Sequence, residues 1–545
     1  MGHAMKVLQK IRPDRPLNSE GYPAYERDWR EEYLRMLLVN TVSDVFYASE
    51  DMLAGRTLQL HDFAADEEPE FMARALVYAR TEGLMRLQPL VGLAVLSLAS
   101  PNCFARVFDR VVITIADLAE FTLALGSLGR GQGGRMVKKL AAARLERLTE
   151  YEVLTYSGDG RGYSLRDLLR VYHPRPKTEA MQALFRHAAG KSGPEGPDPV
   201  LLPRIAAFER LKKTDAGRHP AEAARLISEG RLPWNAVTGA VSEMTPVLWR
   251  ALIPHMSLFS LLRQLSALSG NGFEDEWRKK EEWLYGDGHP EDIFGHESGE
   301  EGKLEPEHVR VPVFTEDRPE PRIVERFCDP EEIRRAKILP FRFAQAWKKV
   351  RISWLRSALE RAVDLSVDNL PEIPGKTAVL LDISSSMEGQ PLLAGSVLAL
   401  SVLRKAGENS LIRLFNTRSY PFAPQPGESI LAAASRITAG GDTDTSVSLK
   451  ELIRRQIRCD NIVIVTDQQQ NKGDEFYTVL QAYRRKIDPG AKAFVISVDP
   501  YIYGMIPAED DKTFYCYGWS DQAVSLIARS VRGYGGLVER VRALE

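Results

Sequence analysis

The sequence predicts two parts of different fold class, an array of α-helices followed by a doubly wound α/β domain. From about residue 30 to residue 268, apolar residues recur at three- and four-residue spacing, which is typical of amphipathic helices. After Lys376, continuous apolar runs alternate with amphipathic helices, which indicates a parallel sheet covered on both faces. A chain of 545 residues is also too long for one ordinary core.

The helical part consists of short segments separated by Pro or Gly. The predicted helices lie at about 32–49, 69–83, 88–99, 133–148, 179–190, 200–213, 245–256 and 257–268. No strict repeat is visible, so the prediction of a helical-repeat array rests on this pattern alone. Acidic residues dominate an expected insertion at about 271–308, and helix returns at 328–367. Pro371 and Pro374 mark a boundary, so we expect domains at 1–370 and 374–545.

The composition is that of a globular protein without a global charge bias. Hydrophobic residues make up 44% and charged residues 27%, and the formal net charge is −2, so any surface for nucleic acid must be local. The four cysteines lie far apart and show no zinc or redox spacing. The N-terminus lacks the apolar core of a signal peptide, and the uncharged stretch at 87–105 is too short to span a bilayer. We therefore expect a cytoplasmic protein with no membrane association.

Oxygen-bearing side chains gather where the predicted strands of the α/β part end. The runs TAVLLDIS, SLIRLFN, NIVIVTD and AKAFVISVDP are the expected strands, and ligands of such sheets lie beyond the carboxyl ends of the strands. These ends carry the candidate metal ligands Asp382, Ser384, Ser386, Thr443 and Asp467. Carboxylate and hydroxyl oxygens suit Mg²⁺ or another hard divalent cation. Taken singly, hydroxyls after a strand more often cap the next helix, so the prediction depends on the combination.

These motifs resemble the von Willebrand factor A domain and its metal-ion-dependent adhesion site. The resemblance covers about 376–542 and includes DISSS, GDTDT and VTDQQ in family order. It implies that Ser384, Ser386 and Thr443 contact the cation directly, and that Asp382 and Asp467 do so largely through water.

A basic stretch at 130–191 stands out in the helical part, where bases outnumber acids by about two to one. Tyrosines and histidines interleave with these bases and offer stacking faces for unpaired nucleotides. The loop GRGQGGR at 129–135 places backbone amides at a helix start, where phosphate is favoured. The alternative is that the basic residues are ordinary solvated surface and that the tyrosines belong to the core. The candidate RNA-binding residues are Arg130, Arg135, Lys138, Lys139, Arg161, Arg166, Arg170, His173 and Arg175.

The helical part resembles the TROVE module of the Ro autoantigen family. The resemblance runs from about 30 to 370 and is carried by GGRMVKKLAAARLERL, GYSLRDLLRVYHPRP, the segment 232–268 and IRRAKILPFRFAQAW. His173 falls on a family histidine that contacts Y RNA, and Arg135, Lys138 and Lys139 fall on the family's basic helix. The family's lysine and arginine ahead of GYSLRD are replaced by Tyr156 and Gly160, with Arg161 adjacent.

The resemblance to Ro implies a monomeric ring of HEAT-like repeats closed by the A domain. It further implies that Y RNA and other small noncoding RNA bind the outer surface, while single-stranded 3′ ends of misfolded RNA enter a central hole. The implied partner in RNA quality control is an exoribonuclease, in bacteria typically polynucleotide phosphorylase.

Two other functions are alternatives to RNA binding. The first is a metal-dependent protein-interaction scaffold, in which a partner carboxylate completes the coordination of the cation. The second is a hydrolase, but the sequence shows no Ser/His/Asp or Cys/His arrangement, and the two aspartates face the metal site. The expectation is therefore a protein without catalytic activity.

Overall fold

The structure is a computed structural model, and packing divides it into two compact units. Residues 22, 28–39, 50–131, 133–156, 162–191, 196–268, 320–338, 340–350, 353–368, 370–498, 504–507, 510–517, 522–532 and 536–544 are described. The first unit combines 1–191, 339–341 and 366–545, and the second combines 192–338 and 342–365. The acidic insertion predicted at 271–308 lies outside the described residues.

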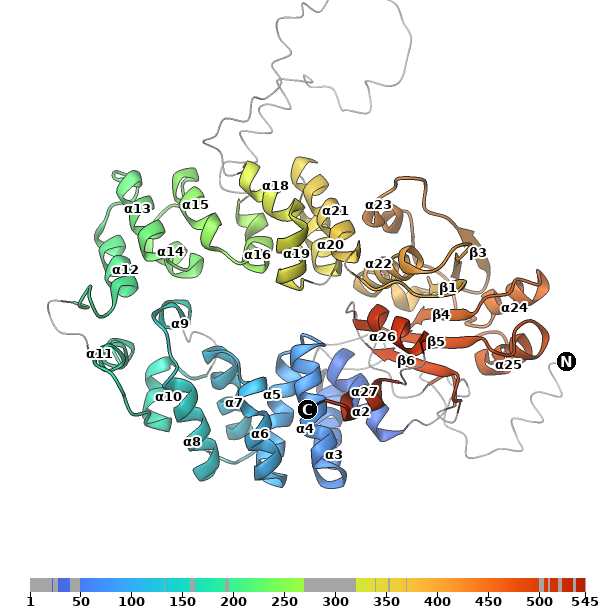
Figure 1. Cartoon of the computed structure of the whole chain (residues 1–545), viewed down its shortest axis with the longest axis horizontal. Helices are drawn as coiled ribbons and strands as arrows, with labels where there is room; N and C mark the ends of the chain where they lie inside the picture. The colour runs from blue at the N-terminus through green and yellow to red at the C-terminus, as the bar shows by residue number, and fades with distance from the viewer. Residues whose placement is uncertain are drawn as a thin grey trace, which may run out of the picture. The chain divides into compact units, whose positions relative to one another are not determined.

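The helical part of the first unit confirms the predicted succession of short helices (Figure 1). Its helices are α2 (Trp29–Val39), α3 (Glu50–Glu67), α4 (Pro69–Thr81), α5 (Leu87–Ala99), α6 (Pro101–Val111), α7 (Ile115–Ser127), α8 (Gly134–Leu145), α9 (Glu150–Thr155), α10 (Leu165–Tyr172) and α11 (Glu179–Ala188). The uncharged stretch at 87–105 forms α5 and the start of α6, and Pro101 separates these two helices. Among the described helices, none has the length and apolarity needed to cross a bilayer.

The second unit is helical throughout its described residues. Its elements are α12 (Pro203–Lys213), α13 (Pro220–Gly230), α14 (Trp234–Ala240), α15 (Pro246–Leu252), η1 (Ile253–His255), α16 (Leu258–Leu268), α18 (Glu320–Cys328), α19 (Pro330–Ala336), most of α20 (Pro340–Lys349) and most of α21 (Ser353–Asp368). The Arg326 guanidinium joins three of them, since it lies on α18, donates to the carbonyl of Ile253 in η1 at 2.5 Å and pairs with Glu332 on α19. The helical stretch predicted at 328–367 is confirmed and consists of three helices, α19, α20 and α21.

The α/β part contains a six-stranded sheet in the order β3-β2-β1-β4-β5-β6. The strands are β1 (Thr377–Asp382), β2 (Leu411–Phe415), β3 (Ser419–Phe422), β4 (Asn461–Thr466), β5 (Lys492–Ser497) and β6 (Thr513–Tyr517). The four predicted strands are confirmed as β1, β2, β4 and β5. All six residues of β1 and of β4 are buried, which is why both read as continuous apolar runs. The edge strand β3, which pairs antiparallel with β2, and the edge strand β6 were not predicted.

The helices of the α/β part alternate with its strands. They are η5 (Ser385–Met387), α22 (Gln390–Lys405), α23 (Ile430–Ser435), α24 (Val447–Arg454), α25 (Phe476–Lys486), α26 (Gln522–Val531) and α27 (Leu537–Arg542). Helix α27 packs against α4, where Arg540 pairs with Glu82 at 3.4 Å and lies 5.7 Å from the ring centroid of Tyr78. This packing explains why α2 to α11 and the α/β part form one unit. The domain limits at 1–370 and 374–545 follow the change in secondary structure and stay a prediction.

Candidate functional site

The first candidate site lies at the carboxyl ends of β1 and β4. These strands are parallel neighbours, and Leu381 pairs with Val465, so Asp382 and Asp467 emerge at the same edge of the sheet. Because β1 also pairs with β2 on its other side, the order of strands reverses at this point. The sheet topology therefore brings together two aspartates that are 85 residues apart in the sequence.

Hydrogen bonds orient the Asp382 carboxylate. Its Oδ1 accepts from the backbone N–H of Ser384 at 2.9 Å, and its Oδ2 accepts from the hydroxyl of Thr466 at 2.6 Å. The hydroxyls of Ser384 and Ser386 lie 3.2 Å apart. Asp382, Ser384 and Asp467 are buried and Ser386 is partly exposed, so the cluster opens toward solvent on the side of Ser386.

The donor set fits a divalent cation. Burial and the negative charge of Asp467 raise the pKa of Asp382 well above its ordinary value. In the described part of the chain, no basic side chain forms an ion pair with Asp382. Two buried carboxylates with adjacent hydroxyl oxygens suit Mg²⁺, which would offset their repulsion. Asp382, Ser384, Ser386, Thr443 and Asp467 would hold this ion.

Backbone and side-chain hydrogen bonds join the loops that carry these residues. The N–H of Ser385 donates to the carbonyl of Gly441 at 3.0 Å, which joins the first loop to the GDTDT loop. The N–H of Thr443 donates to Asn471 Oδ1 at 3.0 Å, and the N–H of Asn471 donates to the carbonyl of Thr443 at 3.1 Å. Asn471 thus positions Thr443. The sequence pattern does not indicate this role, because amide side chains in loops have no distinctive spacing.

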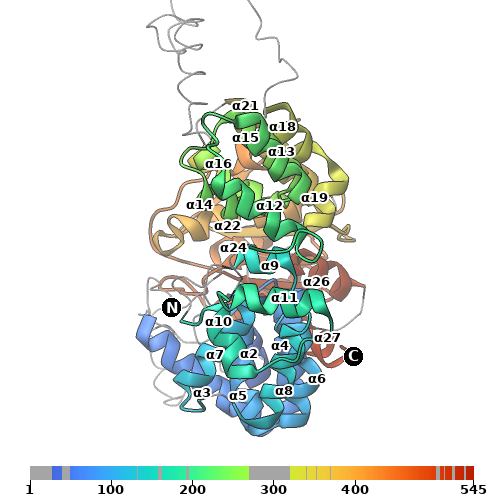
Figure 2. The same ribbon diagram turned by 90° about the vertical axis from the view of Figure 1, so that its left-hand side faces the viewer.

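The second candidate site is the basic surface of α8, α10 and the segment after α10, which lie next to one another with α11 (Figures 1 and 2). It consists of the exposed side chains of Arg135, Lys138, Lys139, Arg166, Arg170, His173 and Arg175. Among the described residues, none of these seven has an ion-pair partner. The positive charge of the six arginines and lysines is therefore available to an external anion.

Glu146 at the end of α8 fixes the segment after α10. Its carboxylate accepts from Lys177 Nζ at 2.7 Å and from the backbone N–H of Arg175 at 3.4 Å. The hydrogen bond from Lys177 and the positive charges nearby lower the pKa of Glu146. His173 ends α10 in the left-handed conformation, with φ 48°, and its side chain is exposed. Glu146 thus joins the end of α8 to the segment after α10 that carries Arg175.

Other basic and aromatic residues of the stretch have structural roles. Arg144, which adds to the basic count, is buried and donates to the carbonyl of Ile113 at 2.9 Å. Arg130, a predicted contact, folds back and donates to the carbonyl of Gly133 at 2.9 Å, so it stabilises the glycine loop. Tyr156 and Tyr172 are buried. These two tyrosines therefore belong to the core, as the alternative interpretation predicts, and do not offer stacking faces for nucleotides. Arg161 lies outside the described residues.

The fold and the first site define a class of protein, a helical-repeat array joined to an α/β domain with a candidate metal site at its switch point. No family model matches the chain. Among solved structures, the crystal structure of Deinococcus radiodurans RO (RSR) protein is similar, with a TM-score of 0.63 and 19% sequence identity. The similarity covers 93% of this chain and 100% of that chain. The predicted Ro-like fold is therefore confirmed.

Proposed function

We propose that this protein binds small noncoding RNA through the basic surface of α8 and α10. The observation that carries the proposal is the set of six exposed arginines and lysines, with the exposed His173 on the same surface, none of which has an ion-pair partner among the described residues. Elsewhere in the first unit, arginines are commonly paired, as Arg80 is with Asp117 and Arg147 with Asp109. Unpaired cations on adjacent helices attract phosphates and release counterions on binding.

The Ro-like fold supports a more specific form of this proposal. The RNA held on the surface is Y RNA or a similar small structured RNA, and the protein also binds the single-stranded 3′ ends of misfolded RNA. The protein then presents RNA to an exoribonuclease such as polynucleotide phosphorylase in the cytoplasm. Its role is binding and presentation and not catalysis.

Neutralising the basic surface tests the proposal. In the triple variant Arg135→Gln, Lys138→Gln, Lys139→Gln, we expect the affinity for a structured small RNA to fall about tenfold or more at moderate salt, and the slope of log K against log salt to become shallower by two or more. The matched control is Arg454→Gln, Arg455→Gln, Arg458→Gln, which removes three exposed cations from the α/β part. Unchanged RNA affinity in the first variant would show that the surface is wrongly assigned.

A second function rests on the buried pair Asp382 and Asp467. We infer that the cluster binds Mg²⁺ or another divalent cation and that a carboxylate from a protein partner completes the coordination, which makes the α/β part a metal-dependent interaction module. Partial exposure of Ser386 supports this inference because it leaves a path to the ion. RNA gel shifts with and without a chelator separate the two functions. Binding through α8 and α10 should survive chelation, whereas a metal-dependent partner should dissociate.

A further inference from the structure

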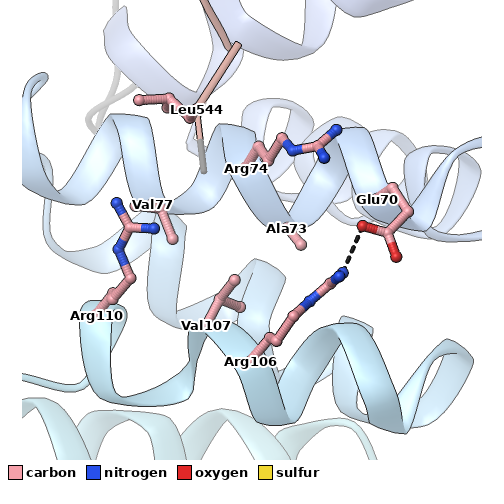
Figure 3. Close-up of a pocket in the computed structure, with 8 residues that line it drawn as sticks. All are labelled: Glu70, Ala73, Arg74, Val77, Arg106, Val107, Arg110 and Leu544. Atoms are coloured by element: carbon pink, nitrogen blue, oxygen red, sulfur yellow. Dashed lines mark hydrogen bonds and ion pairs between the residues drawn. The ribbon is translucent and has the colours of Figure 1, made fainter. Parts of the chain in front are cut away.

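The α/β part of the first unit contacts earlier residues of the chain at several places. Figure 3 shows one of them, a cavity of about 180 Å³ that Leu544, just after α27, lines together with α4 and α6. At another, the hydroxyl of Tyr22 donates to the backbone carbonyl of Gly473, 451 residues further along the chain. Of these two contacts, the one at Tyr22 adjoins the candidate metal site, because Gly473 is two residues after Asn471, which positions Thr443.

The loop that receives Tyr22 is the loop that holds Thr443. The backbone N–H groups of Asn471 and Lys472 donate to the carbonyl of Thr443 at 3.1 and 3.0 Å. The N–H of Thr443 in turn donates to Asn471 Oδ1 at 3.0 Å. Gly473 follows directly, so the carbonyl that accepts from Tyr22 belongs to the same short loop, 471–473. The position of the candidate metal ligand Thr443 therefore depends on where this loop lies.

Side chains fasten the loops of the site to each other. Gln470 Nε2 donates to the carbonyls of Lys472 and Asp474, both at 2.7 Å. Lys450 Nζ pairs with Asp444 at 3.4 Å and with Asp474 at 3.1 Å, so it joins the residue after Thr443 to the loop end. A displacement of the loop at 471–473 is therefore transmitted to the GDTDT loop.

The surroundings of Tyr22 keep its phenol a hydrogen-bond donor. The side chain is partly buried, and the carboxylates of Asp444, Asp474 and Glu475 lie near it. Burial, followed by the negative charges of these three residues, raises the pKa of Tyr22 to about 12. The phenol is therefore neutral at physiological pH and retains the proton that it donates to the carbonyl of Gly473.

We propose that Tyr22 is a positioning residue for the candidate metal site, and that its docking on Gly473 and cation binding at Thr443 favour each other. The inference rests on the metal binding proposed above. Docked Tyr22 restricts the loop at 471–473, so the cation has less loop motion to restrict when it takes the oxygen of Thr443. Because coupling between two binding events is reciprocal, cation binding strengthens the docking of Tyr22 by the same factor. Tyr22 thereby regulates the metal-dependent interaction of the α/β part.

The test compares the full wild-type chain with Tyr22→Phe, which removes the hydroxyl and keeps the ring. Mg²⁺ is titrated calorimetrically, and we expect its affinity to fall about fivefold, the effect of one hydrogen bond. Amide hydrogen exchange, followed by mass spectrometry in chelator, should become faster in the loop at 471–473 by a similar factor. Exchange in β1 and β4 should be unchanged, which separates a local effect on the loop from a general loss of stability.

Two control variants isolate the role of Tyr22. Tyr420→Phe removes the hydroxyl of an exposed tyrosine on β3 and should change neither Mg²⁺ affinity nor exchange in the loop. Arg540→Gln breaks the ion pair with Glu82 where α27 packs against α4, away from the metal site, and should leave Mg²⁺ affinity unchanged.

The outcomes separate this inference from the proposed metal site. Equal Mg²⁺ affinity in the wild type and in Tyr22→Phe would overturn the coupling and leave the metal site intact. A fall in Arg540→Gln as large as in Tyr22→Phe would also overturn it, because general loosening of the α/β part would then explain both. Absence of Mg²⁺ binding by the wild type would overturn the metal site, and the coupling with it.

Discussion

The hydroxyl of Thr466, the last residue of β4, donates a 2.6 Å hydrogen bond to the carboxylate of Asp382, the last residue of β1. This contact joins two neighbouring parallel strands at the point where the order of strands reverses. It holds Asp382 beside Asp467, whose charge opposes ionisation of Asp382. The two buried carboxylates of the candidate metal site therefore repel each other when no cation is bound.

Replacing Asp382 by Asn should separate stability from metal binding. The variant removes a buried negative charge with a like-charged neighbour, so in chelator we expect the free energy of unfolding to rise by about 1 kcal/mol. Mg²⁺ should stabilise the wild type by up to about 2.7 kcal/mol at a hundred times its dissociation constant, and should not stabilise the variant. Thermal unfolding with chelator and with Mg²⁺ measures both effects. Glu388→Gln, an exposed neighbour, is the control, and a retained Mg²⁺ response in Asp382→Asn would contradict the assigned ligands.

Gly473→Ala should weaken the metal site through Asp444. Gly473 has φ 77°, and a Cβ there would overlap the Asp444 carboxylate, which accepts a 2.9 Å hydrogen bond from the N–H of Ser446. The matched control is Gly427→Ala, because Gly427 has φ 78° but open space around it. We expect both variants to lose about 1 kcal/mol from backbone strain, and only Gly473→Ala to lose Mg²⁺ affinity as well. Equal Mg²⁺ affinity of the two variants in calorimetric titrations would show that displacing the Asp444 carboxylate does not disturb the neighbouring metal ligand Thr443.

Tyr172→Phe should change stability and leave RNA binding intact. The Tyr172 hydroxyl lies 2.7 Å from the hydroxyl of Thr122, both side chains are buried, and burial raises the pKa of Tyr172 to about 12. Loss of this hydrogen bond should cost about 1 kcal/mol in urea unfolding. A fall in RNA affinity at unchanged stability would instead place Tyr172 in the RNA contact.

His61 should make stability depend on pH. The His61 ring is buried, and the hydroxyl of Tyr33 lies 3.0 Å from its Nδ1. Burial lowers the pKa of His61 to about 4, so the imidazole is neutral in the folded state. At pH values between the unfolded pKa of His61, about 6.5, and its folded pKa, the unfolded state binds a proton on His61 that the folded state does not. The contribution of His61 to stability is therefore full above about pH 6.5 and falls as the pH drops toward 4. The loss should reach roughly 3 kcal/mol.

Urea unfolding across this pH range measures the effect of His61. His61→Gln should flatten the pH dependence, whereas His173→Gln, at an exposed position, should leave it unchanged. A slope that persists in His61→Gln would assign the pH dependence to other groups.

Much of the fold was predictable because burial leaves a direct mark on sequence. Strands β1 and β4 are buried along their whole length and therefore appear as uninterrupted apolar runs. Strand β3 lies at the edge and is partly exposed, so its residues carry no such run and the strand was missed. The break between α5 and α6 falls at Pro101, whose ring prevents continuation of the helix.

The hydrophobic pattern was enough to predict a helical array followed by an α/β domain, and to identify Asp382, Ser384, Ser386, Thr443 and Asp467 as oxygen donors at strand ends. Which basic residues remain available depends on the three-dimensional packing, because ion pairing and burial involve neighbours distant in the chain. Arg144 is buried against the carbonyl of Ile113, whereas Lys138 on the same helix faces solvent.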